Sequence, residues 1–244
     1  MPKKIIEINN LDYSYPDGTK ALSGINLDVL EGESIGIIGP NGAGKTSLLL
    51  HLNGILDGKG SVKVCGLQVE DKNLPFIRGK VGLVFQDPDS QLFMPTVFDD
   101  VAFGPMNMDM PKNKVLSAVE KALGEVDMLK AKEKIAHHLS FGEKKRVSIA
   151  TVLSMNPEIL ALDEPTSNLD PKHRKNLIEF IKKAKLTKII ATHDLDLVLK
   201  VCSRVVILDK GNLVAQGASC DILSNKTLLE AHELELPLSL PENL

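Results

Sequence analysis

A phosphate-binding pattern lies at residues 39–46, which read Gly39-Pro40-Asn41-Gly42-Ala43-Gly44-Lys45-Thr46 and fit G-x-x-x-x-G-K-[ST]. In such a loop, backbone N–H groups converge on phosphate oxygens, and the helix that follows adds the partial positive charge of its N-terminus. The Lys45 ammonium would contact the β- and γ-phosphates, and the Thr46 hydroxyl would bind Mg²⁺. A dinucleotide fingerprint fits less well, because Ser47 stands where its final Gly or Ala is needed. The sequence therefore predicts a nucleoside triphosphate site that comprises Gly39, Pro40, Asn41, Gly42, Ala43, Gly44, Lys45, Thr46 and Ser47.

Two adjacent carboxylates, Asp163 and Glu164, follow the apolar segment 159–162. At the C-terminal end of a strand both side chains can reach one site as the chain turns. Asp163 would hold Mg²⁺ opposite Thr46, usually through water. Glu164 would polarise the attacking water, a role worth about 10²–10⁴-fold in rate for a positioned base. This pair predicts hydrolysis of the bound nucleotide.

A second place suited to an anion is the start of a predicted helix over 143–153. Ser140 followed three residues later by Glu143 is a capping box, in which each side chain satisfies a backbone N–H of the other. A helix N-terminus with a small hydroxyl and with Gly142 beside it also favours a phosphate. One γ-phosphate could therefore be held between this helix end and a phosphate loop.

The predicted elements give an α/β fold: a P-loop NTPase core with a mostly parallel sheet, an N-terminal antiparallel β subdomain and an inserted helical subdomain. Apolar and β-alternating runs predict strands at 4–15, 26–30, 60–66, 81–85, 159–162, 188–191 and 205–208. The segment 111–123 has the pattern of a helix that begins after a proline. We expect a nucleotide-hydrolysing domain over 4–225, made of a catalytic core (4–86 and 157–225) and a helical subdomain (87–156), and then a short acidic tail over 226–244.

Composition restricts the functional classes. The 244 residues are 43% hydrophobic and 25% charged, with a net charge of −3, which gives no electrostatic argument for a nucleic-acid partner. The basic run Lys144-Lys145-Arg146 is predicted to be a solvated helix face. No apolar stretch approaches the ~20 residues that span a bilayer, and the first residues lack a signal-peptide core. The three cysteines have no metal-ligand spacing and are typical of reduced thiols. We therefore expect a cytoplasmic protein.

Together these motifs resemble those of the ATP-binding cassette (ABC) ATPases in type and in order, over about 5–223. Along the chain they are Lys45 in the phosphate loop, Gln86 at the end of a strand, Ser140-Phe141-Gly142-Glu143, Asp163-Glu164, Ser167-Asn168-Leu169-Asp170 and His193. The usual signature of the family is Leu-Ser-Gly-Gly-Gln, so Phe141 and Glu143 depart from it. Ser140 and Gly142 retain the hydroxyl and the second glycine of that signature.

The resemblance implies a role for each motif. Tyr15 would stack on adenine, with Tyr13 as the competing candidate. Gln86 would bind Mg²⁺ with Thr46 and Asp163 and link the site to the helical insertion, and His193 would contact the γ-phosphate. The catalytic residues would be Glu164, His193 and Gln86. Across a dimer, Asp170 would communicate between subunits, and the signature residues that meet the ATP of the second copy would be Ser140, Gly142 and Glu143.

The Phe-rich segment 85–105 narrows the choice within the family. Four of the seven phenylalanines lie there, which indicates either the core of the helical lobe or an exposed groove for a partner helix. Together with the segment Leu139–Arg146, its sequence is similar to that of ATPase subunits of energy-coupling factor transporters, and most similar to the cobalt/nickel uptake group. That resemblance implies three partners: a second ATPase subunit, identical or related, a transmembrane coupling protein and a substrate-binding membrane protein. It places the chain at the cytoplasmic face of the cell membrane.

Two alternatives remain at this stage. The first is the ATPase subunit of an importer for a vitamin or another small solute. The second is an ABC ATPase without a transport role, such as a DNA-repair or translation-associated protein. Such DNA-repair proteins carry a long coiled coil, and the segment between Gln86 and Ser140 has no sustained heptads. Such translation-associated proteins carry two cassettes, and this chain has one. The sequence therefore favours a transporter.

Overall fold

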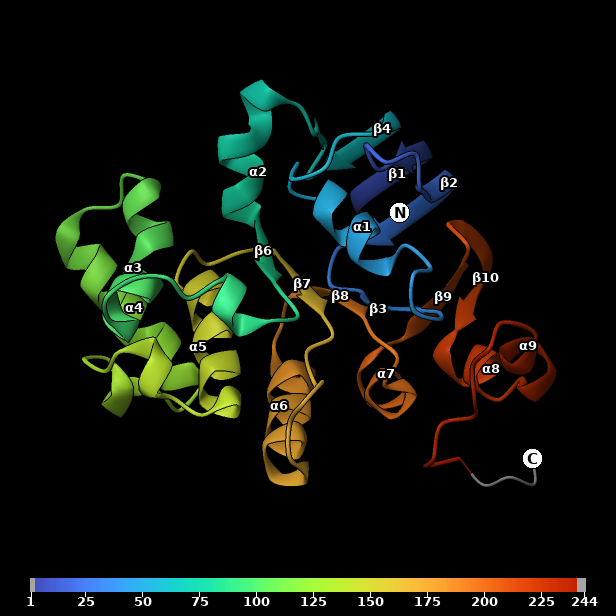
Figure 1. Cartoon of the computed structure of the whole chain (residues 1–244). Helices are drawn as coiled ribbons and strands as arrows, with labels where there is room; N and C mark the ends of the chain where they lie inside the picture. Colours follow the sequence, from blue (N-terminus) through green and yellow to red (C-terminus); the bar gives the residue numbers. More distant parts are fainter. Residues whose placement is uncertain (1–2, 241–244) are drawn as a thin grey trace.

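The computed structural model describes residues 3–240. Its N-terminal part is an antiparallel sheet with the strand order β2-β1-β4-β5 (Figure 1). The strands are β1 (Lys4–Ser14), β2 (Lys20–Leu30), β4 (Lys59–Val64) and β5 (Leu67–Gln68). A turn at Asp17 and Gly18 joins the first two strands, as the sequence predicts, although β2 begins earlier than expected. This sheet lies beside the phosphate loop.

The second sheet has the order β10-β9-β3-β8-β7-β6, and all neighbours in it are parallel except β9 and β10. Its strands are β3 (Ser34–Ile38), β6 (Val81–Val84), β7 (Ile159–Asp163), β8 (Thr187–Ala191), β9 (Arg204–Asp209) and β10 (Asn212–Ala218). The inner strands β3, β7 and β8 are buried along almost their whole length because other elements cover both faces of the sheet. The predicted α/β fold with a mostly parallel sheet is confirmed.

Side chains of the central sheet enter two hydrophobic cores, one on each face. Ala161 packs with Leu48 and the N-terminal sheet, whereas its neighbours Leu160 and Leu162 pack with helices on the opposite face. This alternation follows from the period of two along a strand. The helices that flank the sheet are α1 (Lys45–His51), α2 (Leu74–Lys80), α6 (Pro171–Lys183) and α7 (Leu195–Val201). Carboxyl ends of parallel strands meet at one edge, where β3, β7 and β8 lead into the functional loops.

A helical lobe lies between β6 and β7 in the chain (Figure 1). Its helices are α3 (Val97–Asn107), α4 (Lys112–Glu125) and α5 (Phe141–Leu153). The helix over 97–107 is not among the helices that the sequence predicts. The Thr96 hydroxyl accepts the N–H of Asp99 and caps α3, so the signal was a Thr-x-x-Asp spacing. The division of the chain at 87–156 stays a prediction.

The remaining short elements complete the surface. Two helices follow β10: α8 (Ser219–Leu223) and α9 (Lys226–Ala231), and the second forms the start of the predicted tail. Single 3₁₀ turns lie at Asp71–Asn73, Pro88–Ser90, Leu129–Ala131 and Ala136–His138. Within 3–240, no helix is both long and apolar enough to cross a membrane. The cysteines in this part of the chain are free thiols.

Candidate active site

The predicted nucleotide residues gather around one open cavity of about 480 Å³ at the carboxyl ends of β3 and β7. Segments distant in sequence form it: the hairpin of β1 and β2, the phosphate loop, the turn after β6, the end of β7 and the turn after β8. Its lining includes Tyr15, Asn41, Gly42, Ala43, Gly44, Lys45, Thr46, Ser47, Gln86, Asp163, Glu164 and His193. Of the predicted residues, Gly39 and Pro40 of the loop and Ser140, Gly142, Glu143 and Asp170 are not part of this lining. The structure thus brings together one part of the predicted set and leaves the signature outside.

Close backbone contacts shape the phosphate loop. Gly44 has a φ of 102°, and a Cβ there would lie 2.4 Å from the Ala21 carbonyl oxygen, so only glycine fits. The Lys45 Nζ donates to the carbonyl oxygens of Gly39 at 2.7 Å and Pro40 at 3.0 Å. Burial lowers the pKa of Lys45. The loop itself therefore holds the ammonium at the mouth of α1, where a β-phosphate would lie.

The oxygen atoms near Thr46 suit a hard divalent cation. The Thr46 hydroxyl donates to one carboxylate oxygen of Asp163 at 2.9 Å. The other oxygen of Asp163 is buried and has no hydrogen-bond partner within residues 3–240. Burial raises the pKa of this carboxyl group, because the ionised form is poorly solvated there. A cation that prefers oxygen ligands could bind the Thr46 hydroxyl oxygen and the Asp163 oxygen that is unpaired among the described residues. The residues present therefore fit Mg²⁺.

Glu164 is held rigidly beside this position. It is buried, and its φ of 43° lies in the left-handed region, which is unusual for a residue other than glycine. Its carboxylate accepts the Thr192 hydroxyl at 2.9 Å and the backbone N–H of His193 at 3.1 Å. The Nδ1 atom of His193 lies 2.9 Å from the same carboxylate. These contacts orient an acceptor toward the cavity, as a residue that positions water requires.

Sequence reasoning missed the ion pair that supports the turn containing His193. Both Arg174 nitrogens that face Asp194 donate to its carboxylate, at 2.8 and 2.7 Å, and the Thr166 hydroxyl donates at 2.8 Å. Burial acts to raise the pKa of Asp194, but the hydrogen bonds from Arg174, Leu197 and Thr166 outweigh it and lower the pKa. Asp194 caps α7 by accepting the N–H of Leu197, and a cap of this kind can be predicted from the local sequence. Nothing in the local sequence indicates that Arg174 pairs with Asp194.

The two tyrosines have different environments. The Tyr15 hydroxyl lies 2.8 Å from the Ser47 hydroxyl, and the side chain lines the cavity with 36% of the residue exposed. The Tyr13 ring packs edge-on against both Tyr15 and His51, with ring centres 5.1 and 4.9 Å apart, and does not line the cavity. The geometry therefore favours Tyr15 over Tyr13 as the residue that could stack on a base.

The signature residues form a separate surface at the start of α5. The predicted capping box is present: the Glu143 carboxylate accepts the backbone N–H and the hydroxyl of Ser140, each at 2.8 Å. These hydrogen bonds lower the pKa of Glu143. A Cβ at Gly142 would lie 3.2 Å from the His173 ring, and the His173 Nδ1 is 2.5 Å from Asp170. Asp170 caps α6, the helix that contains His173. His173 therefore lies between Gly142 of the signature and Asp170.

Comparison with known proteins agrees with this geometry. The family model described as "ABC transporter" matches residues 22–167. The energy-coupling factor transporter ATP-binding protein EcfA of Carboxydothermus hydrogenoformans is 48% identical over 96% of this chain and 87% of its own. The solved structure of cbiO1 from Clostridium perfringens, part of the ABC transporter complex cbiONQ, has a TM-score of 0.81 and 39% identity, covering 93% and 94% of the two chains. The dimeric structure of the bacterial ABC transporter cassette MJ0796 has a TM-score of 0.80 at 25% identity, covering 88% and 98%. The chain therefore belongs to the ABC transporter family and is an ATPase of the energy-coupling factor type.

Proposed function

We propose that this chain is the ATP-binding and ATP-hydrolysing subunit of an energy-coupling factor importer for cobalt or nickel ions. The observation that carries the proposal is the single cavity that joins the phosphate loop to Asp163, Glu164 and His193 but leaves Ser140 outside it. The substrate rests on the similarity of the segment 85–105 to the cobalt/nickel group. In this proposal a separate membrane protein binds the metal ion.

In this proposal the predicted residues that line the cavity bind the nucleotide or act in its hydrolysis. Tyr15 stacks on adenine, and the loop N–H groups with Lys45 bind the phosphates. Thr46, Asp163 and Gln86 would hold Mg²⁺, which when bound neutralises charge on the β- and γ-phosphates. Glu164 would accept a hydrogen bond from the attacking water and orient it, and His193, whose Nδ1 lies 2.9 Å from the Glu164 carboxylate, would contact the γ-phosphate.

A second ATPase subunit completes the site. Ser140 and Gly142 lie at a helix N-terminus, which favours an anion, yet they do not line the cavity of their own chain. In the proposed dimer each chain supplies this helix end to the ATP of the other. The γ-phosphate then stabilises the closed dimer because it makes contacts only in that state, and hydrolysis removes them.

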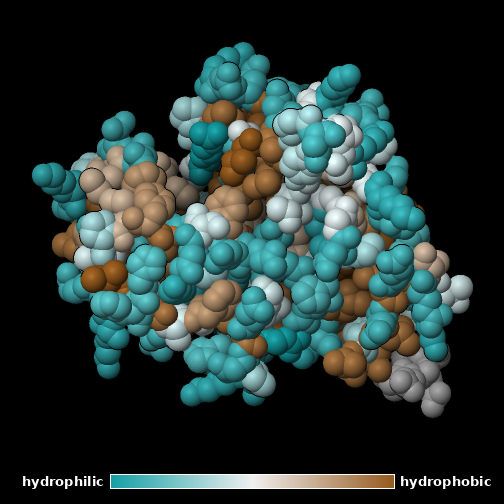
Figure 2. All heavy atoms as spheres, in the orientation of Figure 1, coloured by the Kyte–Doolittle hydropathy of each residue, from teal (hydrophilic) through white to brown (hydrophobic). Residues whose placement is uncertain are grey.

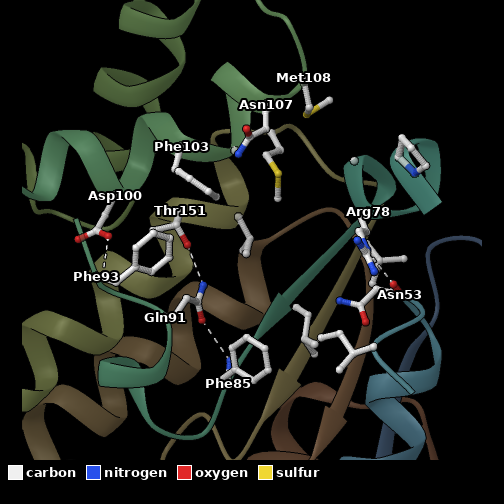
Figure 3. A pocket seen from close by; sticks show the side chains of 18 of the residues that line it. Asn53, Arg78, Phe85, Gln91, Phe93, Asp100, Phe103, Asn107, Met108 and Thr151 are labelled. Atoms are coloured by element: carbon white, nitrogen blue, oxygen red, sulfur yellow. Dashed lines mark hydrogen bonds between the residues drawn. The ribbon is translucent and has the colours of Figure 1, made fainter. Parts of the chain in front are cut away.

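A groove between the two lobes provides a docking surface for the transmembrane coupling protein. It has a volume of about 900 Å³, and Figure 3 shows Phe93 and Phe103 on one wall and Arg78 and Asn53 on the other. Hydrophobic residues gather in the hollow between the lobe with α3 and the lobe with α2 (Figure 2). Phe93 is 64% exposed and packs edge-on against Phe103, whereas Phe98 packs into the helical core. Phe98 thus belongs to the core of the helical lobe, and Phe93 and Phe103 are the exposed residues that we propose contact a partner helix.

Docking in this groove would hold the chain at the cytoplasmic face of the cell membrane as a peripheral subunit. The groove and the ATP cavity are adjacent, because Phe85 lines the groove and the next residue, Gln86, lines the cavity. A change at Gln86 on ATP binding would thereby reach the coupling protein. The direct test is co-purification of the chain with its membrane partners, followed by uptake assays with cobalt, nickel and vitamins. Uptake of a vitamin alone would contradict the proposed substrate, and absence of membrane partners would contradict the transport role.

The substitution Phe93→Asp should weaken association with the coupling protein by at least about tenfold, because it places a charge on an apolar contact surface. ATP hydrolysis by the isolated subunit should be unchanged, since Phe93 does not line the ATP cavity. The measurement is the amount of the membrane partner retained by the tagged subunit. Leu116→Asp is the matched control, because Leu116 is also exposed (45%) but lies outside the groove. Equal retention by both variants would contradict docking at this groove.

The substitution Glu143→Gln should tighten ATP-dependent dimerisation, with an ATP requirement about three- to tenfold lower. Glu143 is ionised at neutral pH, and in the proposed dimer its charge faces the phosphates of the other subunit. Glutamine keeps the capping geometry because its carbonyl oxygen still accepts from Ser140. Dimer formation as a function of ATP concentration measures the effect. An unchanged or higher requirement would show that Glu143 does not repel the nucleotide.

A further inference from the structure

Lys145 is fully buried (0% exposed), although the sequence predicts the basic run 144–146 as a solvated helix face. That prediction is wrong for this residue. Its neighbours Lys144 and Arg146 keep 13% and 26% of their side chains exposed. Consecutive residues on a helix point about 100° apart, so a basic run cannot place all its members on one face. Lys145 is the member that points into the protein.

The Lys145 ammonium is bound to the backbone beside the ATP cavity. Its Nζ donates to the carbonyl oxygens of Gln86 at 2.5 Å and Phe85 at 3.2 Å, just after β6. Burial lowers the pKa of Lys145 to about 8, so the side chain still carries its proton at neutral pH. A buried ammonium is unfavourable unless hydrogen bonds and opposite charges compensate for lost hydration. Here the two carbonyls do so, with Asp163, Asp87 and Glu164 as the nearby negative charges.

Other contacts fasten the segment after Gln86 to the same helix. The Gln91 amide donates to the Ser148 carbonyl at 2.9 Å and to the Thr151 hydroxyl at 2.7 Å, both in α5. Lys144 bonds to Asp89 at 2.7 Å, but half of the Asp89 side chain is exposed, so solvent weakens this pair. Only Lys145 among these side chains holds Gln86 itself.

The same helix begins at the signature. Ser140 caps α5, and Lys145 lies in its second turn, so a rigid helix connects the two. We propose that Lys145 is a positioning residue that keeps Gln86 and Ser140 in a fixed relation, so that ATP binding in this chain places its signature for the ATP of the second subunit. This inference rests on the proposed function, because it needs a site shared between subunits.

The test is ATP-dependent dimerisation in the Glu164→Gln background, measured by size-exclusion chromatography. Lys145→Met keeps the length and apolar stem of the side chain but removes its donors. We expect it to raise the ATP concentration needed for dimerisation about tenfold, the cost of one hydrogen bond to a charged group. Binding of a fluorescent ATP analogue to the dilute single subunit should change less than about twofold, because Lys145 does not touch the nucleotide cavity.

Two further variants separate positioning from folding. Lys144→Met removes the neighbouring cation and should dimerise like the parent. Lys145→Gln retains a donor and should recover part of the dimerisation, and it carries the test if Lys145→Met does not fold. Dimerisation of the folded Lys145 variants at the parent's ATP concentration would overturn the inference and leave the proposed function intact. Equal losses of dimerisation and single-subunit binding would also overturn it. A parent that does not dimerise with ATP would overturn both.

Discussion

Glu164→Gln should lower kcat for ATP hydrolysis by about 10²–10⁴-fold and leave ATP binding nearly unchanged. Glutamine has the same size, and its carbonyl oxygen can still accept from Thr192 and from the N–H of His193, so the turn keeps its shape. What it lacks is the negative charge that orients and polarises water. Because the γ-phosphate is then retained, the variant should accumulate as a closed, ATP-bound dimer.

The measurements are steady-state hydrolysis and the elution volume with and without ATP. Glu179→Gln is the matched control, because it is the same chemical change on the exposed surface of α6. It should hydrolyse ATP at the wild-type rate and show no ATP-stabilised dimer beyond the wild type. A Glu164→Gln chain that turns over near the wild-type rate would remove this residue from the mechanism.

Ser140→Arg should abolish hydrolysis in the partner's site, not in its own. The bulky cation would block the approach of the α5 end to the other chain's ATP, while its own phosphate loop stays intact. Lys45→Ala should disable the chain's own phosphate loop but leave its Ser140 able to complete the partner's site. Homodimers of either variant should therefore be inactive, but a mixed dimer retains one intact site, formed by Lys45 of the first variant and Ser140 of the second. After full subunit exchange, an equal mixture should recover about one quarter of the wild-type sites.

A matched control places both changes in one chain and mixes it with the wild type. If sites are shared, mixed dimers of this kind have no intact site, and about one quarter of the sites remain, all in wild-type dimers. If each chain instead holds a complete site, about one half remain, and the mixture of the two single variants stays inactive. Hydrolysis rates of the two mixtures therefore decide between a shared site and a self-contained one.

The sequence predicted the parts of the site that depend on local spacing. The phosphate loop, the carboxylates after β7 and the capping box of Ser140 all join residues a few positions apart. Such patterns specify a backbone conformation directly, since each glycine, cap or strand end has its own local cause. The α/β fold followed from apolar periodicity for the same reason.

Long-range pairing was not predictable in this way. Arg174 reaches Asp194 across two elements, and Lys145 reaches Gln86 from the helical lobe. The sequence near Arg174 or Lys145 does not indicate which residue it contacts. The contact depends on which face of its helix is buried and on where that helix packs in the fold. The helix α3 was not predicted, although the Thr96–Asp99 spacing at its start is a local cap signal.

The strand order has a consequence for how the protein is made. The strand β3, which leads into the phosphate loop, lies between β8 and β9, which are synthesised far later. A Cβ at Gly39 would lie 2.1 Å from the Leu208 carbonyl oxygen, so the loop is fitted against β9 itself. Contacts between such distant segments form only when both have left the ribosome. We expect a growing chain to fold its N-terminal hairpin early, yet to gain the capacity to bind ATP only near the end of translation.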